Sequence, residues 1–92
     1  MTQATARHIL VNTESECQSL IDQINEGADF GKVAKEHSSC PSSRDGGNLG
    51  TFGKGQMVKE FEEACFEGEV GQVQGPIKTQ FGYHAIEVTA RS

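Results

Sequence analysis

Residues 46–66 read GGNLGTFGKGQMVKEFEEACF, a short apolar segment and a longer periodic one separated by glycines. We predict a strand over Asn48–Phe52 and a helix over about Val58–Phe66, because glycine clusters mark turns and the second segment has apolar residues at helical spacing. The inner side of this helix would be formed by Val58, Phe61 and Cys65. The apolar residues nearest to the glycine-rich turns would line either the core or a hydrophobic cleft, and they are Leu49, Met57, Phe61 and Phe81.

Before this stretch, a strand signal is followed by a helix signal. We predict a strand over Ala4–Val11, which is rich in branched residues and contains no turn residue. Thr13 and Glu16 match a capping box, so a helix should begin at Thr13 and end near Gly27.

The remaining segments complete the predicted order of elements. Asp29 can cap a second, short helix that ends near His37, and Ser38–Gly47 (SSCPSSRDGG) is a turn-rich loop. The C-terminal part is predicted to form a hairpin with strand, turn and strand over Gln74–Lys78, Gln80–Gly82 and Tyr83–Ala90.

This order of strand, two helices, strand, helix and hairpin is typical of an α+β domain with helices packed on a mostly antiparallel sheet. The first and last strands carry the most apolar residues, so we expect them in the centre of the sheet. With 92 residues, the chain should form one domain over residues 1–92.

Composition argues against several classes of function. A net charge of −5 disfavours nucleic acid or an anionic membrane as the main partner. No apolar run approaches the ~20 residues that cross a bilayer. The start, MTQATARHILV, lacks a signal-peptide pattern. Cys17, Cys40 and Cys65 are an odd number without a C-x-x-C pair. We therefore expect a cytoplasmic protein with reduced thiols.

Two histidines interrupt apolar strands. His8 and His84 each share a strand face with apolar residues, because side chains alternate along a strand. A buried imidazole without hydrogen-bond partners costs on the order of 1–3 kcal/mol. The two rings either satisfy each other or a neighbouring hydroxyl within the core, or they form a polar pair beneath an active site. Spacing alone favours the core interpretation.

Common catalytic and metal-binding signatures are absent. The chain contains no phosphate-binding glycine loop, no H-E-x-x-H and no G-x-S-x-G. The three His and three Cys lack the close spacing of zinc ligands, so we expect no metal and no other cofactor. A nucleophilic Cys40 with a distant histidine would indicate a Cys–His hydrolase, but no helix obviously begins at Cys40 to favour a thiolate. The hydrolase stays an alternative.

Four segments follow one another from about Ala6 to Arg91. They are RHILV, GADFGKVAKEHSSCPSS, GGNLGTFGKGQMVKEFEEACF and GPIKTQFGYHAIEV. Together, in this order, they resemble the parvulin family of peptidyl-prolyl cis/trans isomerases. The resemblance implies the parvulin (FKBP-like) fold, a four-stranded antiparallel sheet surrounded by three to four helices. It also implies peptidyl-prolyl isomerase (rotamase) activity.

The resemblance also implies roles for individual residues. His8 and His84 match the paired histidines of the family, Thr79 matches the hydroxyl beside them, and Cys40 matches the Cys/Asp position near the twisting bond. We expect an imidazole–imidazole hydrogen bond between the two strands, with Thr79 and Cys40 in the same network. The pocket for the substrate's proline ring would consist of Leu49, Met57 and Phe61, with Phe81 at a position that is apolar in many bacterial members.

One departure from the family concerns the loop after Cys40. Phosphate-directed members carry a basic cluster there, whereas PSSRDGG holds Arg44 alone with Asp45 beside it. A phosphate needs several charge-assisted donors to offset its desolvation. We therefore expect a monomer that isomerises X–Pro bonds in unfolded or flexible polypeptides, without a phosphate requirement, and so assists folding. The main alternative is a non-enzymatic peptide-binding or chaperone module on the same fold.

Overall fold

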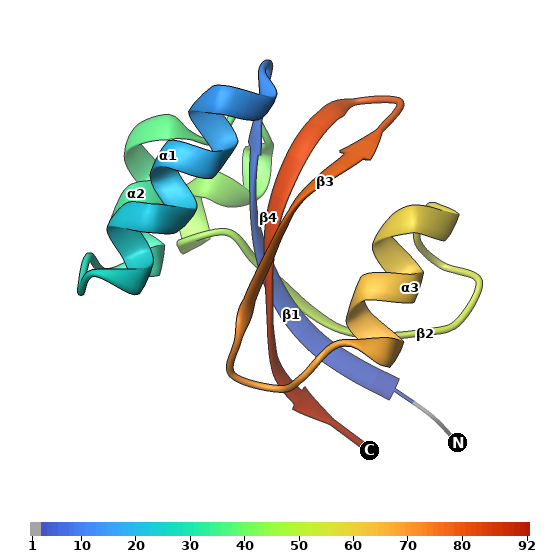
Figure 1. The fold of residues 1–92 in the computed structure, drawn as a ribbon. Helices are drawn as coiled ribbons and strands as arrows, with labels where there is room; N and C mark the ends of the chain where they lie inside the picture. Colours follow the sequence, from blue (N-terminus) through green and yellow to red (C-terminus); the bar gives the residue numbers. More distant parts are fainter. Residues whose placement is uncertain (1–2) are drawn as a thin grey trace.

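Strands β1 (Gln3–Val11) and β4 (Gly82–Arg91) form the centre of an antiparallel sheet in the computed structural model, which describes residues 3–92 (Figure 1). β2 (Asn48–Gly53) and β3 (Val73–Thr79) are the edges, so the strand order is β2-β1-β4-β3. The predicted central position of the first and last strands is confirmed, because their apolar residues are buried on both faces of the sheet.

The sheet separates two apolar layers, because successive side chains of a strand point to opposite faces. Helices α1 (Glu14–Asn25) and α2 (Phe30–His37) cover one face, and α3 (Lys59–Glu67) covers the other (Figure 1). Under α1 and α2 lie Ile9, Val11, Cys17, Leu20, Ile21, Phe30, Val33, Ala34 and Ala85. Under α3 lie Ala4, Ala6, Phe52, Phe61, Cys65, Ile86 and Val88.

The helices begin where the sequence places their caps. The N–H of Glu16 donates to the Thr13 hydroxyl at 3.2 Å, and the N–H of Lys32 donates to the Asp29 carboxylate at 2.9 Å. The turn-rich loop is more regular than predicted, since Pro41–Asp45 forms the 3₁₀ helix η1. Within residues 3–92, every helix is too short or too polar to cross a membrane.

A β-bulge lies where β2 meets β1. Ala6 pairs with Gly50 and Arg7 pairs with Asn48, so Leu49 is an extra residue on β2 with no partner on β1. Gly50 adopts φ +74°, a left-handed conformation that residues with a Cβ rarely adopt. Bulges of this kind redirect a side chain and often occur beside functional sites.

The two ends of the described chain meet at one end of the sheet. The N–H of Ser92 donates to the carbonyl oxygen of Gln3 at 2.9 Å, which closes the β1–β4 ladder (Figure 1). Each predicted strand boundary lies within one residue of the observed one.

Candidate functional site

An apolar cleft of about 510 Å³ opens on the α3 side of the sheet. It is lined by His8, Leu10, Ser39, Cys40, Pro41, Leu49, Gln56, Met57, Val58, Phe61, Phe81 and His84. These residues come from β1, β4, the bulge of β2, the loop before η1 and η1 itself, the loop before α3 and α3 itself, and the β3–β4 turn. None of these side chains is an acid, a lysine or an arginine. The cleft therefore suits a small apolar ring better than a charged group.

Phe61 forms the floor of the cleft and is fixed by aromatic contacts. Its ring is 3% exposed and packs edge-to-face with His8, at a centroid distance of 5.3 Å and an interplanar angle of 79°. The Phe61 ring packs edge-to-face with His84 as well, at a centroid distance of 5.4 Å and an interplanar angle of 85°. Phe81, by contrast, is 61% exposed at the rim.

The two histidines are joined in a chain of hydrogen bonds. Nδ1 of His8 lies 2.9 Å from Nδ1 of His84, and Nε2 of His84 lies 2.7 Å from the Thr79 hydroxyl oxygen. The same oxygen accepts the N–H of Phe81 at 3.1 Å. All three side chains, those of His8, Thr79 and His84, are buried.

The Thr79 hydroxyl sets the direction of this chain. If it donates to Nε2 of His84, then Nδ1–H of His84 donates to Nδ1 of His8, and the free proton of His8 lies on Nε2. The opposite direction would leave the Thr79 hydroxyl proton without an acceptor in residues 3–92. The first direction satisfies more groups. Nε2 of His8, which is buried and has no partner within the described residues, is then a donor beside the cleft.

Burial keeps both imidazoles neutral. Desolvation, followed by repulsion from His84, lowers the pKa of His8 from 6.5 to about 4. Desolvation also lowers the pKa of His84. Each ring can therefore donate one hydrogen bond and accept another at neutral pH, as the chain from Thr79 requires.

Cys40 is held at the wall of the cleft by the backbone of its loop. The N–H of Ser39 donates to the carbonyl of Leu10 at 2.8 Å, and the Ser38 hydroxyl accepts the N–H of Leu10 at 3.0 Å. Gly47 brings the far end of the loop to β1, where its carbonyl accepts the N–H of His8 at 3.0 Å. Gly47 has φ +84°, and a Cβ there would overlap the carbonyl oxygen of His8. The loop is thus fastened to β1 on both sides of Cys40.

Comparison with known proteins shows which family has this fold. The family described as "PPIC-type PPIASE domain" matches residues 1–92. The chain belongs to the parvulin family. A parvulin of Nitrosopumilus maritimus has the same fold, with a TM-score of 0.88, 44% sequence identity, and 98% of each chain covered. The Pin protein of Cenarcheaum symbiosum gives a TM-score of 0.86 and 42% identity, over 96% of this chain and 92% of that one. The parvulin fold predicted from the sequence is confirmed.

Longer proteins also match over this region. The foldase protein PrsA of Geobacillus kaustophilus is 51% identical over 85 residues, which cover 91% of this chain and 30% of that protein. The crystal structure of PrsA from Bacillus anthracis has a TM-score of 0.96 and 36% identity, over 99% of this chain and 42% of that one. This parvulin domain therefore spans about a third of the length of the curated relatives it matches.

Seven of the eight predicted site residues of this parvulin domain line the cleft, and Thr79 lies directly behind it on His84. The predicted imidazole–imidazole bond is present. The expectation that Cys40 joins the network is wrong, because no hydrogen bond links its thiol to either imidazole within residues 3–92. The geometry brings the eight residues together, while their catalytic and binding roles stay predictions.

Five lining residues were not among the predicted site residues, namely Leu10, Ser39, Pro41, Gln56 and Val58. Gln56 had the clearest signal, because it directly precedes Met57 in a glycine-rich turn. Its carboxamide oxygen accepts the N–H of Gly53 at 2.6 Å, which folds the loop before α3.

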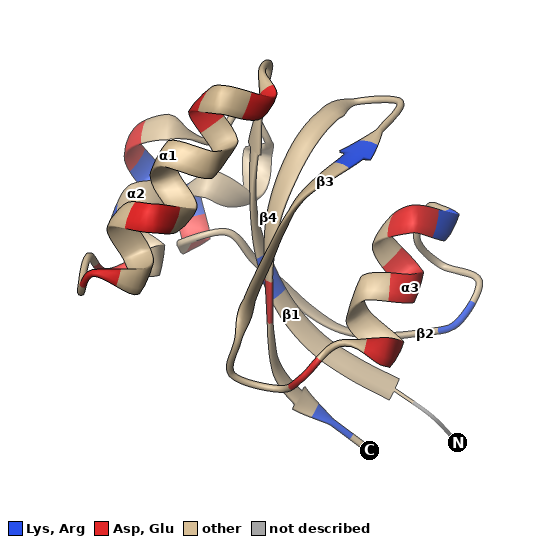
Figure 2. Cartoon of the chain, in the orientation of Figure 1, with Lys and Arg blue, Asp and Glu red and all other residues tan. Residues whose placement is uncertain are grey.

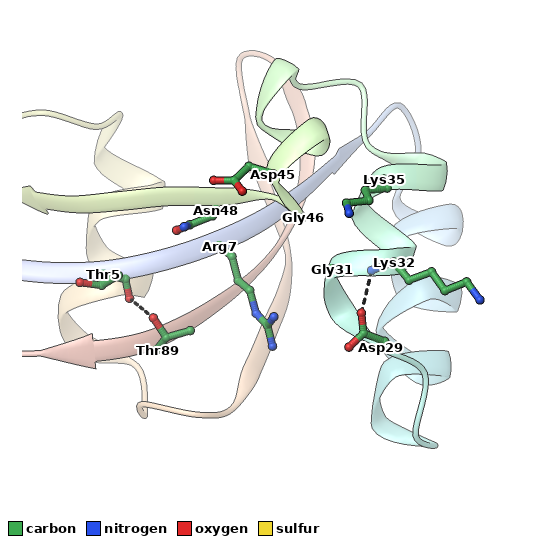
Figure 3. A pocket seen from close by; sticks show the side chains of 10 residues that line it. All are labelled: Thr5, Arg7, Asp29, Gly31, Lys32, Lys35, Asp45, Gly46, Asn48 and Thr89. Atoms are coloured by element: carbon green, nitrogen blue, oxygen red, sulfur yellow. Dashed lines mark hydrogen bonds between the residues drawn. The ribbon is translucent and has the colours of Figure 1, made fainter.

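A second, polar hollow of about 520 Å³ lies on the opposite face, between α2 and the β1–β2 edge (Figure 3). Its charged side chains are Arg7, Lys32, Lys35, Asp29 and Asp45. Arg7 is paired with Glu87, because Nε of Arg7 donates a hydrogen bond to the Glu87 carboxylate at 2.7 Å. The guanidinium of Arg7 also lies 4.6 Å from the centroid of the Phe30 ring. The hollow contains no predicted site residue. It contrasts with the cleft, where the predicted residues converge.

Proposed function

We propose that this parvulin domain accelerates rotation about X–Pro bonds in unfolded or flexible polypeptides, without a phosphate requirement, and so assists protein folding. The observation that carries the proposal is the uncharged cleft formed by Leu49, Met57 and Phe61, which is open to solvent and large enough for a proline ring. The relatives named PrsA foldase support the same activity.

The chemistry needs no covalent bond to break. Rotation about X–Pro disrupts amide resonance, which gives a barrier of about 18–20 kcal/mol. A twisted imide has less charge separation than a planar one, so an apolar cleft that excludes water favours the twisted form. Because only interactions stronger in the transition state accelerate the reaction, this difference lowers the barrier. Each ~1.4 kcal/mol of difference corresponds to a tenfold change in rate.

Kinetics on a peptide series tests the proposal directly. Peptides of sequence X–Pro, varied only at X, should interconvert faster with the protein present, and kcat/KM should be highest for apolar X because the cleft wall is uncharged. Line-shape or exchange NMR at equilibrium measures this rate without a coupled protease. A rate unchanged by stoichiometric protein would reject isomerase activity and favour a module that only binds peptides.

Cys40→Ser separates isomerisation from Cys–His hydrolysis. In the described residues, 3–92, no imidazole is hydrogen-bonded to the Cys40 thiol, so no base there is placed to activate it as a nucleophile. The variant should keep substantial isomerase activity. Complete loss of turnover together with a trapped thioester in the wild type would establish the hydrolase alternative instead.

The charges around the cleft support the absence of a phosphate requirement. Arg44 is exposed on η1 and does not line the cleft. α3, whose Phe61 forms the floor, carries Glu60, Glu62, Glu63 and Glu67, and Figure 2 shows acidic residues along this helix. A doubly charged phosphate would meet repulsion here and would find no cluster of cationic donors.

Phosphorylation of the residue before proline should therefore slow the reaction. We expect kcat/KM for a phosphoSer-Pro peptide to be at least about tenfold lower than for the same Ser-Pro peptide, because about 1.4 kcal/mol of repulsion and uncompensated desolvation is enough for a tenfold loss. A Glu-Pro peptide controls for charge without phosphate geometry. Faster turnover of the phosphorylated peptide would contradict the proposal.

The setting in which this domain works is also a proposal. Three free thiols, at Cys17, Cys40 and Cys65, suit a reducing compartment, and burial raises the pKa of Cys17 to about 11 and of Cys65 to about 12. We propose a cytoplasmic monomer that acts on polypeptides rather than on nucleic acid or membranes. Fractionation of cells and light scattering of the native protein test this, and a secreted or dimeric protein would contradict it.

A further inference from the structure

The loop before α3 forms part of one wall of the cleft but has little structure of its own. Residues 54–57 connect β2 to α3 (Figure 1), and Met57, one of the residues proposed to hold the proline ring, lines the cleft. Gly55 has φ +91°, and a Cβ added there would meet nothing within 4 Å, so no packed side chain limits the backbone at this point. The position of Met57 therefore depends on contacts that reach the loop from other elements.

Glu62 of α3 supplies such a contact. Its carboxylate accepts a hydrogen bond from the backbone N–H of Gly55. Within residues 3–92, this is the only hydrogen bond that joins residues 54–57 to α3. The bond between Gln56 and Gly53 joins the loop to the end of β2 instead. Because its acceptor is charged, the bond to Glu62 belongs to the stronger kind of hydrogen bond.

The part of α3 that carries Glu62 is itself firmly packed. Phe61, the preceding residue, is buried beneath the cleft, and Glu62 is half-buried. Phe66 lies about one helical turn after Glu62, and the centroid of its ring is 5.6 Å from the ammonium of Lys54. The loop is therefore held along one face of the helix that also provides the floor of the cleft.

We propose that Glu62 is a positioning residue for the cleft: its carboxylate holds Gly55, and thereby keeps Met57 where the substrate's proline ring binds. This inference rests on the proposed isomerase function. Glu62 is not among the residues that line the cleft, so it acts on the substrate only through the loop. Without the bond, the loop adopts other conformations, and the substrate binds only the fraction of molecules in which the loop is in place. The bond should therefore affect KM and leave kcat nearly unchanged.

Glu62→Ala removes the acceptor of this bond. On an X–Pro peptide, both KM and the dissociation constant measured by titration should rise about fivefold, the size expected for one hydrogen bond, while kcat stays within about twofold. Glu62→Gln keeps an oxygen that can accept the N–H, so its KM should stay within about twofold of the wild-type value. Glu63→Ala removes the same charge from the next residue of the helix, whose exposed side chain forms no hydrogen bond within residues 3–92, and should change neither constant.

Two further measurements address the bond itself. Exchange of the Gly55 amide proton with water should be about tenfold faster in Glu62→Ala than in the wild type or in Glu63→Ala. Chemical synthesis of the chain can also replace the peptide bond between Lys54 and Gly55 with an ester, which removes the donor and keeps every side chain. The ester should raise KM about as much as Glu62→Ala does, and the two changes together should raise it no further.

The outcomes separate this proposal from the isomerase function. Unchanged KM and dissociation constant in Glu62→Ala, an equal rise in Glu63→Ala, or additive effects of the ester and Glu62→Ala would each overturn the role of Glu62. A wild type that binds the peptide without accelerating its isomerisation would reject the isomerase function instead, and the dissociation constants would then decide whether Glu62 positions the loop. A wild type that neither binds nor isomerises the peptide would reject both.

Discussion

Phe61→Ala should lower the free energy of unfolding by about 3–5 kcal/mol, the usual cost of removing a buried aromatic ring. Phe61 is 3% exposed and packs edge-to-face with both His8 and His84. Small domains are typically stable by only 5–15 kcal/mol, so the variant should be partly unfolded at 37 °C. Urea unfolding followed by circular dichroism measures the change.

Phe61→Leu separates the role of Phe61 in the cleft from its role in stability. Leucine fills most of the volume, so it should cost only about 1–1.5 kcal/mol and leave the protein folded. It lacks the flat ring that forms the floor, and kcat/KM should still fall about tenfold. Val70→Ala, at an apolar residue that is 47% exposed, should change neither property. Full activity of Phe61→Leu would show that Phe61 is not part of the proline pocket.

Acidification should destabilise the protein between pH 6.5 and about pH 4, by on the order of 3 kcal/mol for His8 alone. The pKa of His8 is lower in the folded state than in the unfolded state, so the unfolded chain binds more protons in this window. Stability is therefore complete above pH 6.5 and is lost as the pH falls towards 4. The lowered pKa of His84 acts in the same direction.

The carboxylates also titrate near pH 4, so a variant must isolate the histidine contribution. His8→Asn should be less stable at pH 7 but should lose less further stability on going to pH 4.5 than the wild type. His37→Gln, at an exposed residue at the end of α2, should follow the wild-type curve. Parallel curves for wild type and His8→Asn would show that the imidazole pair does not control acid stability.

Local signals in the sequence predicted most of the fold. The caps Thr13 and Asp29 are short-range features, and the structure places the helix starts at both of them. The central strands followed from their apolar content. The local pattern predicted only a loop around Pro41, where the family resemblance allowed a further helical element and the structure has η1. The bulge at Leu49 was not predicted. A bulge depends on the register against β1, which no local pattern within β2 reveals.

The site was predictable where the family resemblance supplied positions. Spacing alone favoured a core role for His8 and His84, and the structure shows that they are both buried and beside the cleft. Cys40 lines the cleft, but within residues 3–92 its thiol has no hydrogen bond to either imidazole. Ser39 and Gln56 were missed because their side chains reach the cleft through tertiary contacts of two loops.

The hydrogen bond from Ser92 to Gln3 means that the chain enters and leaves this domain almost at the same point. A domain whose two ends are adjacent can be inserted into a longer polypeptide, with both connections on the same side of the domain. In the far longer PrsA relatives, the matched region is 30% of the whole. Gln3 and Ser92 both lie outside the set of residues that line the cleft.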